Sequence, residues 1–90
     1  MTEKIQLDLS GVDSLESFHD IAAECFVFPS YYGRNQDAFW DCLTDMVGVI
    51  EVDIVGHKKM DETTKGLVDP YLSMLFEYMT EEEGFTVRKS

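Results

Sequence analysis

Two aspartates four residues apart, Asp37 and Asp41, are the side chains best placed to do chemistry, and the only tryptophan, Trp40, stands between them. Residues four apart share a helix face, and at 100° per residue Asp41 falls about 40° to one side of Asp37 and Trp40 about 60° to the other. The apolar residues of this segment fall between about 140° and 240° on the same wheel: Phe39, Cys42, Leu43 and Met46. A helix here would carry two carboxylates and a large aromatic opposite its core stripe, where a tryptophan has little reason to stand unless something binds it.

Catalysis is the first function to weigh for a carboxylate pair. A retaining glycosidase needs two carboxyls about 5–5.5 Å apart, which adjacent helical turns could supply. An exposed helix supplies neither the enclosing cleft nor the dry environment that separates two pKa values, so we predict no enzymatic activity. The helix dipole explains Asp37 in the first turn, but it does not explain Asp41, because aspartate is a poor helix former in mid-helix.

The histidines and cysteines predict no metal or cofactor site. His19 and His57 have no neighbours at ligand spacing. Cys25 and Cys42 lack CxxC spacing and stand on expected apolar helix faces, which indicates buried free thiols in a reducing compartment. The first residues lack the pattern of a secretory signal and no apolar run approaches 18 residues. The sequence therefore predicts a cytoplasmic protein with no membrane span.

The charge of the chain narrows the class of partner. Seven basic and eighteen acidic residues give a net charge of −11. Such a small acidic protein repels nucleic acid backbones and anionic lipid. It attracts basic surfaces and speeds encounter with a basic partner. The alternative is that the charge serves solubility alone.

Three strands are predicted from alternating and β-branched residues. They lie at residues 5–9, 47–55 and 85–88. The first begins with Ile5, Leu7 and Leu9 in alternation with polar residues, and Ser10-Gly11 closes it. Residues 57–66 are polar and predicted to be irregular, with room for one helical turn.

Three main helices are predicted from apolar periodicity and end signals. The first runs from about Ser14 to Cys25, behind a capping box of Asp13 and Glu16. The second follows an Asn35 N-cap and runs to about Met46. The third starts at Asp69-Pro70, an N-cap followed by proline, and runs to about Glu83 with Gly84 as the residue beyond its end.

The order of these elements indicates a fold class. The connections between strands are long enough for crossovers, which favours a parallel sheet, and right-handed crossovers would put the long helices on one sheet face. The sequence predicts one α/β domain over residues 1–90, a three-stranded parallel sheet packed by three main helices plus a possible short one.

Residues 29–44 resemble the signature of a known family. The matching positions combine a Tyr-Tyr-Gly turn with a helix that carries both aspartates and the tryptophan: Pro29, Tyr31-Tyr32-Gly33, Asn35, Asp37-Ala38 and Trp40-Asp41-Cys42-Leu43-Thr44. This pattern resembles the barstar family, intracellular inhibitors of extracellular ribonucleases such as barnase. The order of strands and helices over all 90 residues also agrees with a barstar-like fold.

The resemblance implies a binding mechanism. In that family the second helix and the loop before it plug the ribonuclease active site. By position, Asp41 would enter the site that holds the substrate phosphate, and Asp37 would bind basic residues nearby. The other implied contacts are Tyr31 and Gly33 on the loop and Asn35, Gln36, Trp40 and Thr44 on the helix. A further acidic contact on the last helix would fall opposite Tyr78 or Met79.

Four residues depart from the best-known family pattern. Arg34 replaces an acidic residue, Gln36 an apolar one, and Asp45 and Met46 a glycine and a tryptophan. They lie on the rim of the implied contact, and rim residues tune partner choice more than the existence of binding. The cognate ribonuclease therefore need not be barnase.

Two functions stay open at the level of sequence. The first is a proteinaceous ribonuclease inhibitor that occludes a basic enzyme's active site and is a monomer when free. The second is an acidic interaction module on the same scaffold that binds a basic protein other than a ribonuclease. Net charge cannot separate them.

Overall fold

A three-stranded parallel sheet forms one layer of the molecule, as the sequence predicts. The computed structural model describes residues 2–90. The strands are β1 (Thr2–Asp8), β2 (Val49–Val55) and β3 (Phe85–Lys89), in the order β1-β2-β3. All pairs are parallel, and the register places Ile5 beside Val52 and Val52 beside Val87. These side chains alternate with exposed ones, so the buried side chains share one sheet face.

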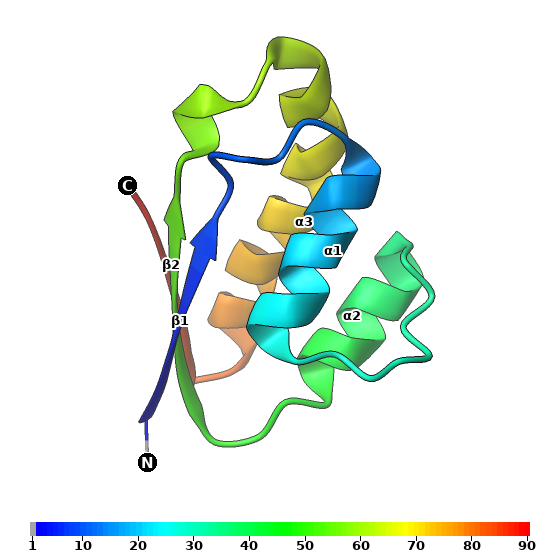
Figure 1. Ribbon diagram of the computed structural model, residues 1–90. Coiled ribbons are helices and arrows are strands. Elements are labelled where there is room, and N and C mark those ends of the chain that lie inside the picture. Colours follow the sequence, from blue (N-terminus) through cyan, green and yellow to red (C-terminus); the bar gives the residue numbers. More distant parts are fainter. Residues whose placement is uncertain (1) are drawn as a thin grey trace.

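The helices form a second layer on that face. They are α1 (Leu15–Phe26), α2 (Gln36–Thr44) and α3 (Glu62–Glu81), and the short 3₁₀ helix η1 (His57–Lys59) follows β2. Figure 1 shows α1 and α3 covering the sheet and α2 on their outer side. Contacts join α1 to β1, α3 to β3 and α2 to α3. The nine-residue helix α2 is thus carried by the other helices rather than by the sheet.

The start of α3 differs from the sequence prediction. The helix begins at Glu62, eight residues before Pro70, because the Asp61 carboxylate accepts a hydrogen bond from the Thr64 backbone N–H at 2.8 Å and caps it. That hydrogen bond is the main cause of the lowered pKa of Asp61. Pro70 stands inside the helix, and its missing N–H would have bonded the carbonyl of Gly66, where both residues are exposed. Water can satisfy that carbonyl, so the proline is tolerated.

The helix ends also correct the sequence reading. The capping box of α1 joins Ser14 and Ser17, not Asp13 and Glu16; the Ser14 hydroxyl accepts from the Ser17 N–H at 3.0 Å. The Ser17 hydroxyl in turn accepts from the backbone N–H of Ser14, while the Glu16 side chain is exposed to solvent. Helix α2 stops at Thr44 and α3 at Glu81, each two residues early.

Gly84 has a packing role instead of a capping one. A Cβ atom on it would lie 3.2 Å from the carbonyl oxygen of Gly48, so a larger residue here would push the two turns slightly apart. The turn before β3 is thereby held against the turn before β2.

The core lies between the sheet and the helices. Its fully buried side chains include Phe18 of α1, Phe39 of α2 and Leu75 of α3. No helix among residues 2–90 has the length and apolar character needed to cross a membrane.

Candidate functional site

The loop between α1 and α2 presents one tyrosine to solvent and buries its neighbour. Tyr31 is 82% exposed, whereas Tyr32 is 8% exposed. The loop starts with Val27 in the left-handed region, at φ 55°, where its side chain is 79% exposed. Phe28 turns inward and packs against Phe26 and Tyr32. The loop is therefore anchored by the rings of Phe28 and Tyr32, which leaves Tyr31 free to contact a partner.

Two contacts fasten this loop to α1. The Tyr32 hydroxyl lies 2.8 Å from Nδ1 of His19, which is buried. The Arg34 guanidinium donates to the Asp20 carboxylate at 2.7 Å and to the Glu16 carbonyl at 3.0 Å. Arg34 is thus paired with groups of its own chain, so its charge is held in an intramolecular ion pair.

The buried histidine gives the loop a pH dependence. Burial lowers the pKa of His19, and the nearby Arg34 adds to the effect. In the unfolded chain a histidine titrates near its ordinary pKa of about 6.5, so below that pH the unfolded state binds more protons and stability falls. We expect the free energy of unfolding to be lower at pH 5 than at pH 7, measured by urea denaturation.

A matched pair of variants assigns that pH dependence. His19→Gln keeps a partner for Tyr32 but cannot ionise, so the fall in stability between pH 7 and pH 5 should shrink. His57→Gln should leave the fall in place, because the His57 side chain is hydrogen-bonded to the exposed carboxylate of Asp69, at 2.8 Å. An unchanged fall in His19→Gln would contradict the assignment.

The start of α2 is built by two of the predicted contact residues. Asn35 is the N-cap, as predicted: its side-chain oxygen accepts from the Ala38 N–H at 2.8 Å, and its amide donates to the Gly33 carbonyl at 3.3 Å. A Cβ atom on Gly33 would lie 3.2 Å from that of Ala38. Asn35 and Gly33 therefore have structural roles whether or not they touch a partner.

Trp40 corrects the sequence argument. The tryptophan is half-buried, and its ring meets Tyr78 of α3 edge-to-face, with centroids 5.7 Å apart and planes at 80°. A helical wheel shows only the core stripe of α2, so it misses the second helix that covers this side. Trp40 therefore has a packing reason to lie on this face, and its position does not by itself imply a partner.

The two aspartates keep their predicted exposure. Asp37 and Asp41 are exposed on α2, and neither makes a salt bridge within residues 2–90. Gln36 is also exposed, while the Thr44 hydroxyl donates to the Trp40 carbonyl at 2.9 Å. The carboxylates are thus presented to solvent without a cation from their own chain.

Asp41 lies on a ridge between two depressions. The first, of about 710 Å³, brings together residues of α2 and α3: Gln36, Asp37, Trp40, Asp41, Met74 and Glu77. The second is lined by loop residues and the far end of α2: Phe26, Val27, Phe28, Pro29, Tyr31, Asp41, Cys42, Asp45 and Met46. Five of the eight predicted contact residues line these depressions: Tyr31, Gln36, Asp37, Trp40 and Asp41. Gly33 and Asn35 precede the first residue of α2, and Thr44 is its last residue.

Glu77 is a candidate site residue that the sequence prediction did not include. The expected acidic contact on the last helix fell opposite Tyr78 or Met79, but Tyr78 is buried and Met79 half-buried. Glu77 is exposed and shares the depression with Asp37 and Asp41. The signal available in the sequence was that Glu77 is acidic and directly precedes Tyr78.

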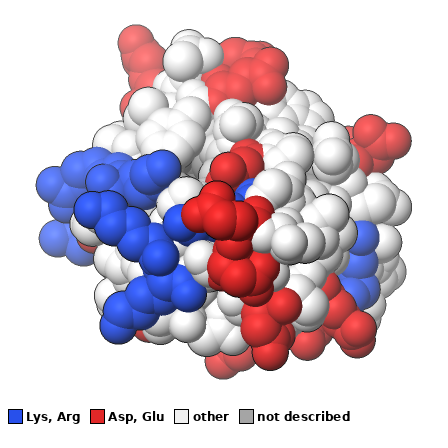
Figure 2. Space-filling model, turned by 90° about the horizontal axis from the view of Figure 1, so that it is seen from above, with Lys and Arg blue, Asp and Glu red and all other residues white. Residues whose placement is uncertain are grey.

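Four of the seven basic residues lie away from α2, whereas Arg34 lies in the loop before it. Lys58 and Lys59 lie on η1, and Arg88 and Lys89 on β3, elements that Figure 1 places on the sheet side, away from α2. Figure 2 shows the larger group of Lys and Arg at the left of this view and a smaller one at its right edge. No cluster of three or more metal-ligating side chains occurs within residues 2–90. The site can therefore attract a cationic group through acids that face solvent.

Comparison with known proteins agrees with the family resemblance of residues 29–44. A family model described as "Barstar (barnase inhibitor)" matches residues 2–88. The "Putative ribonuclease inhibitor YrdF" of Bacillus subtilis (strain 168) is 48% identical over 44 residues, a stretch that covers 49% of this chain and 48% of that protein. The chain thus matches about half the length of this relative.

Proposed function

Because the chain belongs to the barstar family, we propose that it inhibits a basic ribonuclease by covering the enzyme's active site with α2 and the loop before it. The observation that carries the proposal is the carboxylate of Asp41, exposed without a cation of its own on a ridge between two depressions. The chain would act in the cytoplasm, as a monomer, and without turnover of its own.

Asp41 would act as a phosphate mimic. A ribonuclease binds the substrate phosphate with cationic side chains, and a carboxylate offers them oxygen acceptors of similar geometry. A planar guanidinium can grip either group through two parallel hydrogen bonds. Since Asp41 stands on a ridge, it can enter a concave active site ahead of the rest of α2.

The groups beside Asp41 would extend the contact. Asp37 and Glu77 share one depression and add two negative charges there. Tyr31, 82% exposed, borders the other and offers a large apolar ring. The pattern of central charge with an aromatic beside it is typical of residues that dominate binding energy.

The proposal is tested with a panel of small microbial ribonucleases that includes barnase. We expect at least one to be inhibited, with KM raised and kcat unchanged, because the inhibitor competes with substrate for the phosphate site. If no ribonuclease of the panel is inhibited, the proposal is wrong. Capture of a basic protein without ribonuclease activity would then favour the alternative of a general acidic interaction module.

A further inference from the structure

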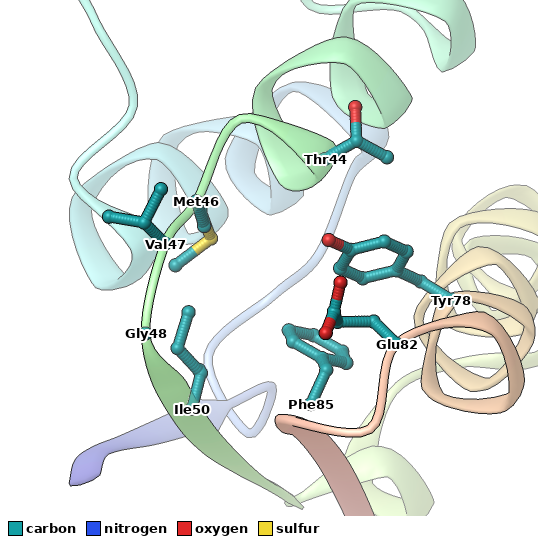
Figure 3. A pocket seen from close by; sticks show the side chains of 8 residues that line it. All are labelled: Thr44, Met46, Val47, Gly48, Ile50, Tyr78, Glu82 and Phe85. Atoms are coloured by element: carbon teal, nitrogen blue, oxygen red, sulfur yellow. The ribbon is translucent and has the colours of Figure 1, made fainter. Parts of the chain in front are cut away.

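A separate pocket lies at the far end of α2, where the turn into β2 meets the end of α3. It has a volume of about 330 Å³. Ile50 and Phe85 close its base, and each is only 2% exposed. Met46 lies on one side of the pocket, and Tyr78 and Glu82 lie on the opposite side (Figure 3). The pocket thus has a base closed by two apolar side chains and one polar side.

The polar side holds a hydroxyl without a partner. Tyr78 is 9% exposed, yet its hydroxyl makes no hydrogen bond to another group within residues 2–90. Figure 3 shows this hydroxyl, and the carboxylate of Glu82, pointing into the pocket. Burial is the main cause that raises the pKa of Tyr78, and Glu82 and Glu81 raise it further. The hydroxyl therefore keeps its proton at neutral pH and is free to bond a group that enters the pocket.

The charge around the pocket selects the sign of that partner. Glu82 is the charged residue that lines it, and no cation pairs with Glu82 within residues 2–90. Glu81, Glu82 and Glu83 follow one another at the C-terminal end of α3, where the negative end of the helix dipole makes acids unfavourable. Thr44, the last residue of α2, brings a second helix C-terminus to the rim. An anion would be repelled here and a cation attracted.

We propose that this pocket binds an arginine or lysine side chain of the ribonuclease partner, a step that rests on the proposed function. The aliphatic stem would lie along Met46, and the cationic head would meet the Glu82 carboxylate and the Tyr78 side chain. The pocket continues the proposed contact surface, because Thr44 is one helical turn from Asp41. The pocket would therefore bind a basic side chain beside the partner's active site.

The chemistry of the pocket is tested without any ribonuclease. Nα-acetyl-arginine methylamide is titrated into the ¹⁵N-labelled protein, with the uncharged Nα-acetyl-norleucine methylamide as the comparison probe. The arginine probe should cause saturating shifts at the amides of Gly48 and Glu82. Glu82→Gln should weaken its binding about tenfold, since a charge-assisted contact is lost. Glu83→Gln, with the same change of net charge outside the pocket, should bind as the parent does.

Tyr78→Phe supplies a second variant that keeps the ring against Trp40. It should weaken the arginine probe less than Glu82→Gln does, because it removes only a neutral hydroxyl. Absence of a saturating shift, equal shifts with the norleucine probe, or equal effects of Glu82→Gln and Glu83→Gln would overturn the pocket's preference for a basic side chain.

The identity of the occupant is tested with the ribonuclease that the protein inhibits most tightly. Glu82→Gln should speed dissociation of the complex about tenfold, and Glu83→Gln should not. If both variants dissociate like the parent while the arginine probe still binds, the pocket does not hold a side chain of that partner. If no ribonuclease is inhibited at all, the proposed function fails, whereas the probe titration still decides the pocket.

Discussion

Replacing Asp41 by alanine should weaken inhibition of the cognate ribonuclease more than any other single substitution. The carboxylate would be desolvated among the cations of a phosphate site, and its removal leaves them buried without a counter-charge. Such truncations cost about 2–5 kcal/mol, or roughly 30- to 5,000-fold in Kd. Barnase–barstar measurements are themselves a source of that general range, so it is not a value calculated for this chain. The measurement is the inhibition constant of parent and variant.

The fold should survive this substitution. Asp41 is exposed and makes no side-chain salt bridge within residues 2–90. Alanine is also the better helix former at a mid-helix position. We expect the free energy of unfolding in urea to be unchanged or slightly raised, so that a loss of inhibition reports binding alone.

A control of equal charge completes the comparison. Glu51→Gln removes one negative charge from β2, on the sheet face that carries no helices, and should leave Kd within about twofold of the parent. Asp41→Asn keeps the shape of the side chain but loses its charge. If Asp41→Asn or Asp41→Ala inhibits as well as the parent, the role of phosphate mimic is wrong.

The sheet could be predicted because its signals are local. Alternation in residues 5–9 and the β-branched run before Val55 mark strands, and the long segments between them leave crossovers as the simple connection. The buried alternate residues of β1, β2 and β3 confirm that reading. Parallel pairing followed from segment length rather than from any one residue.

The start of α3 could not be predicted from end signals alone. Asp69-Pro70 is a good local N-terminus, and Asp61 is another eight residues earlier. Thr64 and Val68 decide between them, since both are buried and extend the inward face of the helix before the proline. Burial of that extra face outweighs one backbone hydrogen bond lost at an exposed position.

The candidate site could likewise be predicted only in part. The exposure of Asp37 and Asp41 follows from the period of one helix. The packing of Trp40 on Tyr78, the nearness of Glu77 and the pocket at Glu82 all depend on how α2 crosses α3. Helix crossing is set by side chains of both partners, so a wheel drawn for α2 alone cannot show it.

Association with the ribonuclease should slow steeply as salt is added. The chain carries a net charge of −11, while η1 and β3 carry four of its seven basic residues on the side away from α2. A basic enzyme is therefore drawn toward the helices rather than toward the sheet. We expect the association rate constant to fall about tenfold or more between 50 mM and 500 mM NaCl, measured by stopped-flow fluorescence.

The position of the charge, and not only its sum, should govern this rate. Glu77→Gln and Glu51→Gln change the net charge equally, but Glu77 lies beside Asp37 and Asp41 and Glu51 lies on the opposite sheet face. Fields act over about 10 Å at 0.1 M salt, so only Glu77→Gln should slow association at low salt, by about twofold. Equal effects would mean that net charge alone sets the encounter rate, and a rate independent of salt would remove steering from the mechanism.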